Sequence, residues 1–347
     1  MLAAYTTLQH AQKVKEFLVK HNLLNQQYSL VKELEHLYFP ILKKVNIPLA
    51  KVVNTKFSFP IRSSELSLET LLKNKLTKKE LELLPKSQEI VGQILILEIP
   101  EELHKKEKII AQAYLKYHKT IETVVKKKAM HEGLYRLRKV TILAGKKTKE
   151  TIHSENGIKL KLHLEKTYFS ARSNNERLRI AKLVKESEDV LVMFSGAGPY
   201  PLVIAKNSLA KKVYGIEINP LAHQYALTNI ALNKLEERVI IYEGDARKIA
   251  PSLHKKFDRI VMPLPKTSEE FLDLALPLVK EGGHIHLYSF LREDEIEPEA
   301  KRIVLEQKKR GWNIKIKNKV TCGQFAPHVF RICFDLELMK RKKEMKN

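Results

Sequence analysis

The chain has 347 residues, with 63 Lys and Arg against 40 Asp and Glu, so its formal net charge is +23 at pH 7. No stretch approaches the ~20 apolar residues that a membrane-spanning helix needs, and the amino terminus lacks the basic and apolar regions of a signal peptide. Its two cysteines, Cys322 and Cys333, are too few for a disulfide framework and wrongly spaced for a zinc site. We therefore expect a cytoplasmic protein without a membrane span or a metal centre.

The basic excess has one sign, which favours a polyanionic partner. A lysine-rich surface can also serve only solubility and thermal robustness, but glutamate would then rise together with lysine. Nucleic acid is therefore the expected partner.

A small α+β domain is predicted over residues 1–60. The stretch "AQKVKEFLVKHNLL" places Val14, Phe17 and Leu18 on one helical face, with lysines opposite. The stretch "EHLYFPI" then predicts a short strand that ends at Pro40.

Residues 61–74 predict a linker because they begin with polar and serine-bearing sequence, and a second α+β domain is predicted over 75–150. Its strongest strand signal is Ile94 to Ile99. The lysine-rich "EELHKKEKIIAQAYLKYHKTIETVVKK" predicts a long helix whose apolar stripe is formed by Ile109, Ile110, Ala113 and Leu115. In "GLYRLRKVTILAG", strand spacing would put Arg136 and Arg138 on one face.

A doubly wound α/β domain is predicted over residues 151–347. Strand-like runs alternate with helical stretches, and the runs are "DVLVMFSG", "KKVYGIEI", "ERVIIYEGD", "FDRIVMPLP" and "HIHLYSF". Such alternation is typical of a parallel sheet with helices on both faces. Beyond the last helix, "NIKIKNKV" and "HVFRICFDLEL" predict two further strands that could pair as a hairpin.

The loop "FSGAGPYP" after the first of these strands indicates a nucleotide-like ligand. Ligands of such folds bind at the carboxyl ends of the strands, where the strand order reverses. Gly196 and Gly198 stand one residue apart, but no third glycine follows to let a helix start close beneath a pyrophosphate. This pattern favours S-adenosylmethionine, which has no phosphate, over NAD.

The next two strands end in carboxylates. Glu217, in "VYGIEINP", is placed to accept both hydroxyls of a ribose, and Asp245 is placed to accept from the adenine amino group. Each alone could be an ordinary polar residue at a strand end. Three successive strand-to-helix junctions with this chemistry predict a class I methyltransferase.

Longer motifs carry a family resemblance over nearly the whole chain. They are "HNLLNQQY", "LPKSQEIVGQILILEIPEEL", "EGLYRLRKVTILAG", "TIHSENG", "TYFSARSNNERLRIA", "MFSGAGPYP", "IEINP" and "FAPHVFRICFDL". In this order they resemble the archaeal and eukaryotic class I tRNA (guanine-37-N1)-methyltransferases, which share a superfamily with the wyosine-pathway aminocarboxypropyl transferases.

The resemblance implies a Rossmann-like class I methyltransferase domain preceded by two small α+β domains. In the family, the first domain recognises the tRNA elbow, and the other two clasp the anticodon stem-loop. It also implies S-adenosylmethionine as cofactor, tRNA as partner, and methylation of N1 of guanosine 37 by a cytoplasmic monomer that needs no membrane and no obligate protein partner.

The resemblance also implies residue roles. Glu176 matches the family's proposed general base, Arg136 its catalytic arginine, Tyr168 a tyrosine that shapes the guanine site, and Arg177 an arginine that holds the cofactor. Outside this resemblance, Glu176 and Arg177 fit a charged helix face, and Arg136 fits a phosphate contact. The other residues expected at the cofactor are Phe194, Ser195, Gly196, Gly198, Glu217, Ile218, Asp245, Ala246 and Pro263.

Two positions depart from the family pattern. Val192 stands where an aspartate is usual, and Pro263, in "MPLPK", stands where the family has an asparagine that helps to orient the guanine. Proline offers a carbonyl oxygen and a rigid wall but no amide donor. The alternatives are therefore an aminocarboxypropyl transferase and a catalytically silent tRNA-binding protein. Retention of "YFSAR" and "NNER" favours the methyltransferase over the first alternative. Joint retention of Glu176, Arg136, Glu217 and Asp245 favours it over the second.

Overall fold

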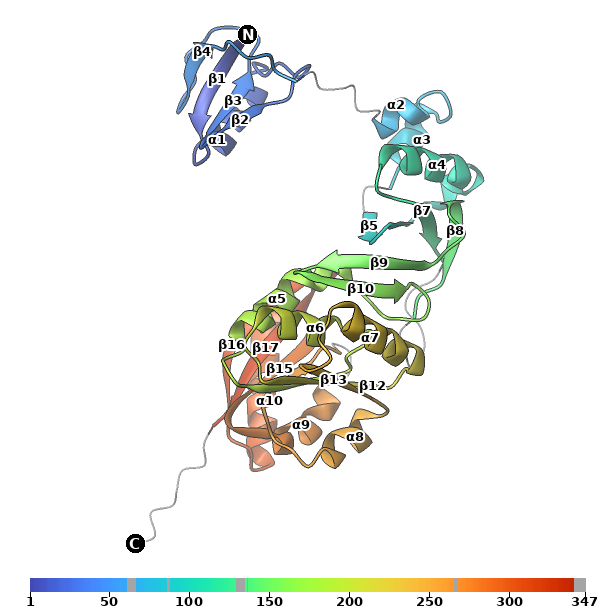
Figure 1. The fold of residues 1–347 in the computed structure, drawn as a ribbon, viewed down its shortest axis with the longest axis vertical. Coiled ribbons are helices and arrows are strands. Elements are labelled where there is room, and N and C mark those ends of the chain that lie inside the picture. Colours follow the sequence, from blue (N-terminus) through green and yellow to red (C-terminus); the bar gives the residue numbers. More distant parts are fainter. Residues whose placement is uncertain (61–66, 86–87, 129–134, 136, 265–267, 340–347) are drawn as a thin grey trace. The chain divides into compact units, whose positions relative to one another are not determined.

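The computed structural model describes residues 1–347 except 61–66, 86–87, 129–134, 136, 265–267 and 340–347 (Figure 1). The chain divides into two compact units, Met1–Leu81 and Glu82–Asn347. Among the residues described, no helix is long and apolar enough to cross a bilayer. The domain boundaries expected at residues 60, 74 and 150 stay predictions.

The first unit contains a four-stranded antiparallel sheet in the order β2-β3-β1-β4. Its elements are β1 (Leu2–Thr7), α1 (Ala11–Lys20), β2 (Val31–Glu33), β3 (His36–Pro40), β4 (Lys51–Asn54), α2 (Leu68–Leu72) and α3 (Lys78–Glu82). Val14 and Leu18 of α1 are buried in one core with Phe39 of β3, and Phe17 packs at its margin. The helical spacing and the strand ending at Pro40 are therefore confirmed.

The second unit begins with another four-stranded sheet, in the order β5-β6-β7-β8. Its elements are β5 (Gln88–Val91), β6 (Ile94–Leu97), η1 (Glu101–Lys106), α4 (Glu107–Tyr117), β7 (Thr123–Lys127) and β8 (Val140–Gly145). The predicted long helix was wrong at its end, because Val124 and Val125 pair with β6 in a strand. Such β-branched residues fit a pleated sheet better than a helix. Ile109, predicted in the apolar stripe, is exposed.

A β-hairpin follows, formed by β9 (Glu150–Glu155) and β10 (Ile158–His163). Asn156 and Gly157 form its turn with φ values of 44° and 78°, the left-handed backbone that two-residue hairpin turns require. The hairpin binds the preceding sheet, since the His153 ring accepts from the Gly92 amide at 3.1 Å and the Thr151 hydroxyl accepts from the Gln93 amide at 2.9 Å.

The remainder is a seven-stranded sheet in the order β13-β12-β11-β14-β15-β17-β16. Its strands are β11 (Asp189–Met193), β12 (Lys212–Glu217), β13 (Val239–Glu243), β14 (Phe257–Met262), β15 (Val279–Arg292), β16 (Ile314–Ala326) and β17 (Val329–Leu338). The first five run parallel, and β17 pairs antiparallel with β15 and β16. The predicted α/β fold with a terminal hairpin is therefore confirmed.

Helices cover both faces of this sheet (Figure 1). They are α5 (Asn174–Leu183), α6 (Pro199–Asn207), α7 (Pro220–Leu232), α8 (Ala246–Ser252), α9 (Leu272–Leu278) and α10 (Ile296–Lys309), with the short turns η2 (Ala171–Ser173), η3 (Ser268–Phe271) and η4 (Glu293–Glu295). Alternate residues of β11 serve the two sides, because Val190 and Val192 join the core under α5, α6 and α7, whereas Leu191 and Met193 join the core under α8, α9 and α10. Because β11 is buried on both faces, its sequence is an unbroken apolar run, Val190 to Met193, instead of an alternation of apolar and polar residues.

Candidate active site

The loop after β11 turns sharply where the strand order reverses. Phe194, Gly196 and Gly198 have φ values of 62°, 57° and 88°, and Gly198 begins α6. Gly215 of β12 makes room for this turn, because a Cβ atom there would lie 3.0 Å from the Ser195 hydroxyl. The loop therefore needs glycine both in its own backbone and in the neighbouring strand.

Glu217, at the end of β12, is held by backbone donors. Its Oε2 accepts from the Gly196 amide at 2.6 Å, and its Oε1 accepts from the Asn219 amide at 2.8 Å. Burial nevertheless raises the pKa of Glu217 above its ordinary value. Because each carboxylate oxygen has a second lone pair, Glu217 can accept two further hydrogen bonds, as a vicinal diol requires.

A cavity of about 510 Å³ opens beside Glu217. Its size lies in the usual range for small-molecule and cofactor sites. Phe194 and Phe271 form an aromatic wall with ring centroids 4.8 Å apart, and the Arg247 guanidinium lies 4.2 Å from the Phe271 centroid. The lining residues are Tyr135, Tyr168, Phe194, Gly196, Ile216, Glu217, Ile218, Asn219, Ala222, Gly244, Asp245, Ala246, Arg247, Pro263, Leu264, Glu270 and Phe271.

Asp245 has a structural role in addition to lining the cavity. It is the N-cap of α8, and its Oδ1 accepts from the Arg247 amide at 2.9 Å. An adenine amino group would therefore have to donate to Asp245 Oδ2 or to the second lone pair of Oδ1.

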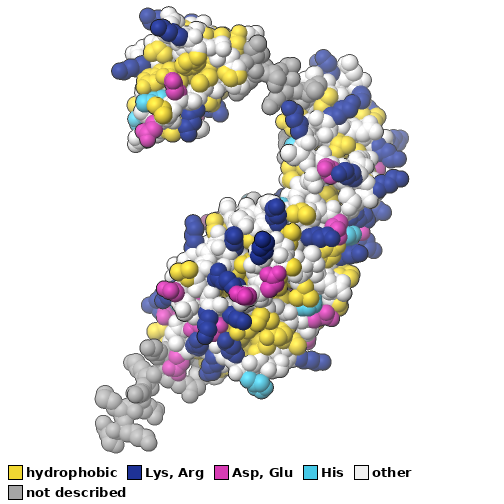
Figure 2. All heavy atoms as spheres, in the orientation of Figure 1, with side chains coloured by type: hydrophobic (Ala, Val, Ile, Leu, Met, Phe, Trp, Pro, Cys, Tyr) yellow, Lys and Arg dark blue, Asp and Glu magenta, His cyan; other side chains and the backbone are white. Residues whose placement is uncertain are grey.

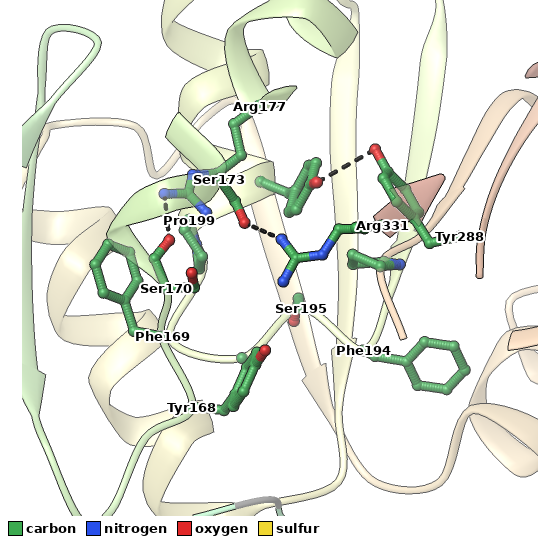
Figure 3. Close-up of a pocket in the computed structure, with 13 residues that line it drawn as sticks. Tyr168, Phe169, Ser170, Ser173, Arg177, Phe194, Ser195, Pro199, Tyr288 and Arg331 are labelled. Atoms are coloured by element: carbon green, nitrogen blue, oxygen red, sulfur yellow. Dashed lines mark hydrogen bonds between the residues drawn. The ribbon is translucent and has the colours of Figure 1, made fainter. Parts of the chain in front are cut away.

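A smaller pocket of about 60 Å³ adjoins the cavity (Figure 3). Tyr168, Phe194, Gly196 and Pro263 line both spaces. The further lining residues of the pocket are Phe169, Ser170, Ser173, Arg177, Ser195, Pro199, Tyr200, Tyr288 and Arg331. A ligand in the cavity and a group in the pocket would therefore both contact these four shared residues.

Arg177 enters the pocket with its charge already paired. Its Nε and Nη2 donate to Glu155 of β9, both at 2.6 Å, and Nη2 also donates to the Ser170 carbonyl at 3.1 Å. Burial acts to raise the pKa of Glu155, but hydrogen bonds from His153 and Arg177 outweigh it and hold this pKa below its usual value. Arg177 thus fixes the loop that carries Ser170 and Phe169.

Glu176, the adjacent residue, lies behind the pocket and lines neither space. It is 5% exposed. Arg179 donates to both of its oxygens, at 2.7 Å and 2.8 Å, and the Tyr288 hydroxyl donates to Oε1 at 2.6 Å. Tyr288 therefore lies between Glu176 and the pocket.

Arg331 of β17 directs its guanidinium into the pocket toward Ser173 (Figure 3). It donates to the Ser173 hydroxyl, and its Nε is buried without a hydrogen-bond partner. None of the ion pairs among the described residues includes Arg331. The pocket therefore contains one paired guanidinium, that of Arg177, and one without a carboxylate partner, that of Arg331.

The structure brings together most residues that the sequence singled out. The cavity gathers Phe194, Gly196, Glu217, Ile218, Asp245, Ala246 and Pro263, and the pocket gathers Arg177 and Ser195, while Tyr168 borders both. Gly198 lines neither space and instead begins α6. Arg136 and the end of the "MPLPK" motif lie outside the described residues. Arg138 is buried and paired with Glu89.

Sequence reasoning missed Ser173, Tyr200, Phe271, Tyr288 and Arg331. Ser173 and Arg331 stand inside quoted motifs, "TYFSARSNNER" and "FAPHVFRICFDL", and could have been considered as polar groups at the start of α5 and near the start of β17. Tyr288 gives no local signal, because its partner Glu176 is 112 residues away.

The strand order, the glycine loop and the carboxylates at successive strand ends define a class I methyltransferase that uses S-adenosylmethionine. Residues 151–316 match the TRM5/TYW2 methyltransferase domain, 68–148 the TYW2 N-terminal domain, and 6–49 the tRNA methyltransferase 5 N-terminal domain. The chain belongs to the TRM5/TYW2 methyltransferase family.

Relatives match along nearly the full chain. The tRNA (guanine(37)-N(1))-methyltransferase Trm5b of Pyrococcus abyssi is 34% identical over 97% of this chain and 99% of its own length. Its crystal structure has a TM-score of 0.74 at 35% identity and covers 98% of this chain and 100% of that one. A solved complex of aTrm5 with tRNALeu has a TM-score of 0.69 at 30% identity and covers 97% and 100% of the two chains.

Proposed function

We propose that the protein transfers a methyl group from S-adenosylmethionine to N1 of guanosine 37 in tRNA. The observation that carries this proposal is the shared wall between a cofactor-sized cavity at Glu217 and a small pocket backed by Glu176. Full-length similarity to enzymes named for this reaction supports it.

The reaction needs a proton acceptor and a cation. Bound S-adenosylmethionine would supply an electrophilic methyl group next to the pocket. Removing the N1 proton of guanine spreads negative charge to O6, so a carboxylate near N1 and a cation near O6 both lower the barrier. Glu176 is the proposed acceptor, and Arg331 is the described cation that faces the pocket without a carboxylate partner. Arg136 stays a predicted second cation.

Tyr168 and Pro263 belong to the wall that the two spaces share. An aromatic ring and a proline ring can hold a base by its faces, whereas the polar groups of the pocket can contact its edge. Pro263 would then shape the guanine site as a rigid surface, while hydrogen bonding comes from other residues.

The surface charge suits a tRNA partner. Lysine and arginine side chains are spread over the visible face of the methyltransferase part (Figure 2), in line with the net charge of +23. We further propose that the domain predicted over residues 1–60 contacts the tRNA elbow and that the domains predicted over 75–150 and 151–347 clasp the anticodon stem-loop. A cytoplasmic location and activity without an obligate protein partner stay predictions.

Transfer of a methyl group from labelled S-adenosylmethionine tests the proposal. Two tRNA transcripts that differ only in carrying guanosine or adenosine at position 37 would be compared. We expect label on the guanosine transcript alone. Equal label on both would place the reaction at another nucleotide, and no label on either, despite tRNA binding, would support a catalytically silent protein.

A further inference from the structure

The path from the pocket to Glu176 passes through one hydroxyl group. Tyr288 of β15 lines the pocket, is 1% exposed, and donates its hydroxyl proton to Glu176 Oε1 at 2.6 Å. The Tyr200 hydroxyl donates to the Tyr288 oxygen at 3.2 Å (Figure 3). A phenol oxygen has two lone pairs, so one remains to accept from a group in the pocket.

We propose that Tyr288 carries the proton from the target base to Glu176, an inference that rests on the proposed function. The guanine N1 proton would move to the Tyr288 oxygen while the Tyr288 hydroxyl proton moves to Glu176 Oε1. The N1 electron pair forms the new N–CH₃ bond, and the electron pair of the broken S–C bond stays on sulfur. Tyr288 is thereby regenerated, and Glu176 ends protonated.

The surroundings of Tyr288 favour such a relay over a lasting phenolate. Burial raises the pKa of Tyr288 well above its ordinary value, so the side chain returns to the neutral phenol. A relay needs only that the two proton transfers are concerted or nearly so. Glu176 does not line the pocket itself, and the hydroxyl therefore supplies the missing contact.

The groups behind Glu176 form a buried network of carboxylates and guanidinium groups. Arg179 is shared between Glu176 and Asp335, with donors 2.8 Å and 3.1 Å from the Asp335 oxygens. Asp335 accepts from His286 Nδ1 at 2.6 Å, and Arg259 donates to His286 Nε2 at 2.7 Å and to Glu188 at 2.9 Å.

His286 adds no charge to this network. Burial lowers its pKa, and because Arg259 can only donate, the remaining ring proton sits on Nδ1 and points at Asp335. Three carboxylates, those of Glu176, Asp335 and Glu188, therefore face two guanidinium groups. Arg179 would keep its bonds to Asp335 after Glu176 accepts the proton.

Two conservative variants test the relay. Tyr288→Phe removes the hydroxyl but keeps the ring, and Tyr225→Phe is the matched control because it removes a hydroxyl that donates to another carboxylate, Glu150 Oε2 at 2.6 Å, outside both linings. Single-turnover methylation of a guanosine-37 tRNA would be measured with both. We expect Tyr288→Phe to be slower by ~10²-fold, as for loss of general-base catalysis, with unchanged Kd values for S-adenosylmethionine and tRNA. Tyr225→Phe should change the rate by about threefold or less.

The double variant Glu176→Gln/Tyr288→Phe separates a relay from a packing role. Residues acting in series give a double variant no slower than the single ones, whereas independent effects multiply. A wild-type rate in Tyr288→Phe, or multiplied losses in the double variant, would overturn the proposal.

Proton inventory on the wild-type protein covers the case in which Tyr288→Phe does not fold. Rates in mixtures of H₂O and D₂O should curve if two protons move together and should stay linear if only one moves. A linear plot would reject the relay while leaving the methyltransferase intact. Absence of any methylated product from the wild-type protein would reject the proposed function and the relay together.

Discussion

The large cavity and the small pocket share a wall, yet different interactions hold the residues that line them. In the cavity, the backbone amides of Gly196 and Asn219 fix both oxygens of the Glu217 carboxylate, and the rings of Phe194 and Phe271 form one wall. In the pocket, Arg177, Tyr288 and their partners belong to buried ion pairs and hydrogen bonds that extend along one face of the sheet.

This difference suits two tasks. Binding a cofactor requires a fixed shape, which strand ends and a glycine loop provide locally. Moving a proton and stabilising a developing charge require groups whose orientation and charge are set in advance, in a place from which water is largely excluded. Substitutions in the cavity should therefore weaken cofactor binding, whereas substitutions around the pocket should slow methyl transfer or destabilise the fold.

The largest effect is expected from Arg179→Met. This change leaves Glu176 and Asp335 buried without their shared cation, and breaking a buried pair costs about 3–5 kcal/mol of unfolding free energy. Urea unfolding would measure it. Arg302→Met is the control, since Arg302 also bridges several carboxylates but is exposed, and should cost at most about 1 kcal/mol. Equal costs would mean that burial of the network adds nothing.

Arg331→Ala should slow single-turnover methylation by ~10²-fold, as for removal of one donor to a developing oxyanion. Affinity for S-adenosylmethionine should not change, because the proposed contact is with the base. Arg310→Ala removes an exposed arginine outside both linings and should be silent. A parallel loss of cofactor affinity would instead assign Arg331 to the cofactor's carboxylate.

Glu217→Gln should weaken S-adenosylmethionine binding by roughly 10- to 100-fold, since hydrogen bonds to a charged group contribute about 1.5–3 kcal/mol. Calorimetry would measure this, and Glu243→Gln, at the exposed end of the adjacent strand, is the control. Slower chemistry with intact binding would place Glu217 with the pocket rather than the cavity.

Cofactor binding should also depend on pH through Glu217. The pKa of this carboxyl group is raised, so it is protonated at a higher pH than an ordinary glutamate. Because the carboxylate is the better acceptor for the diol, affinity should fall as the pH decreases through this raised pKa, and Glu217→Gln should remove that dependence. A pH dependence that survives in the variant would have to come from another group.

The smallest effect is expected from Asn229→Ala. The buried Asn229 amide bonds both the amide and the carbonyl of Lys161 and also the Ala197 carbonyl, so it joins the hairpin to the glycine loop. Its loss should cost about 1–2 kcal/mol by thermal or urea unfolding. Asn233→Ala removes a similar bridge to Lys159 at a more exposed position and should cost less.

Features made by residues that lie close together in the sequence could be predicted from it, whereas features that join distant residues could not. The glycine loop, Glu217 and Asp245 each lie within a few residues of a strand end, so local pattern was enough. The hairpin turn at Asn156–Gly157 is also local, because Asn-Gly is a typical two-residue turn, although no hairpin was predicted there. The predicted helix over residues 101–127 was too long because apolar and lysine residues continue from α4 into β7, where the β-branched pair Val124 and Val125 favours a strand.

The residues around the pocket could not be predicted from local sequence pattern. Tyr288 meets Glu176 across 112 residues, and Arg179 meets Asp335 across 156. Such partners come together only through the strand order of the sheet, which periodicity does not specify. The family resemblance placed Glu176 in the mechanism but did not indicate that a tyrosine separates it from the pocket.

The most direct test of the proposed reaction is nucleoside mass spectrometry of a guanosine-37 tRNA after incubation with the protein and S-adenosylmethionine. We expect 1-methylguanosine at position 37, formed with Pro263 in the shared wall. An aminocarboxypropyl adduct, or methylation at another atom of the base, would refute the proposed reaction.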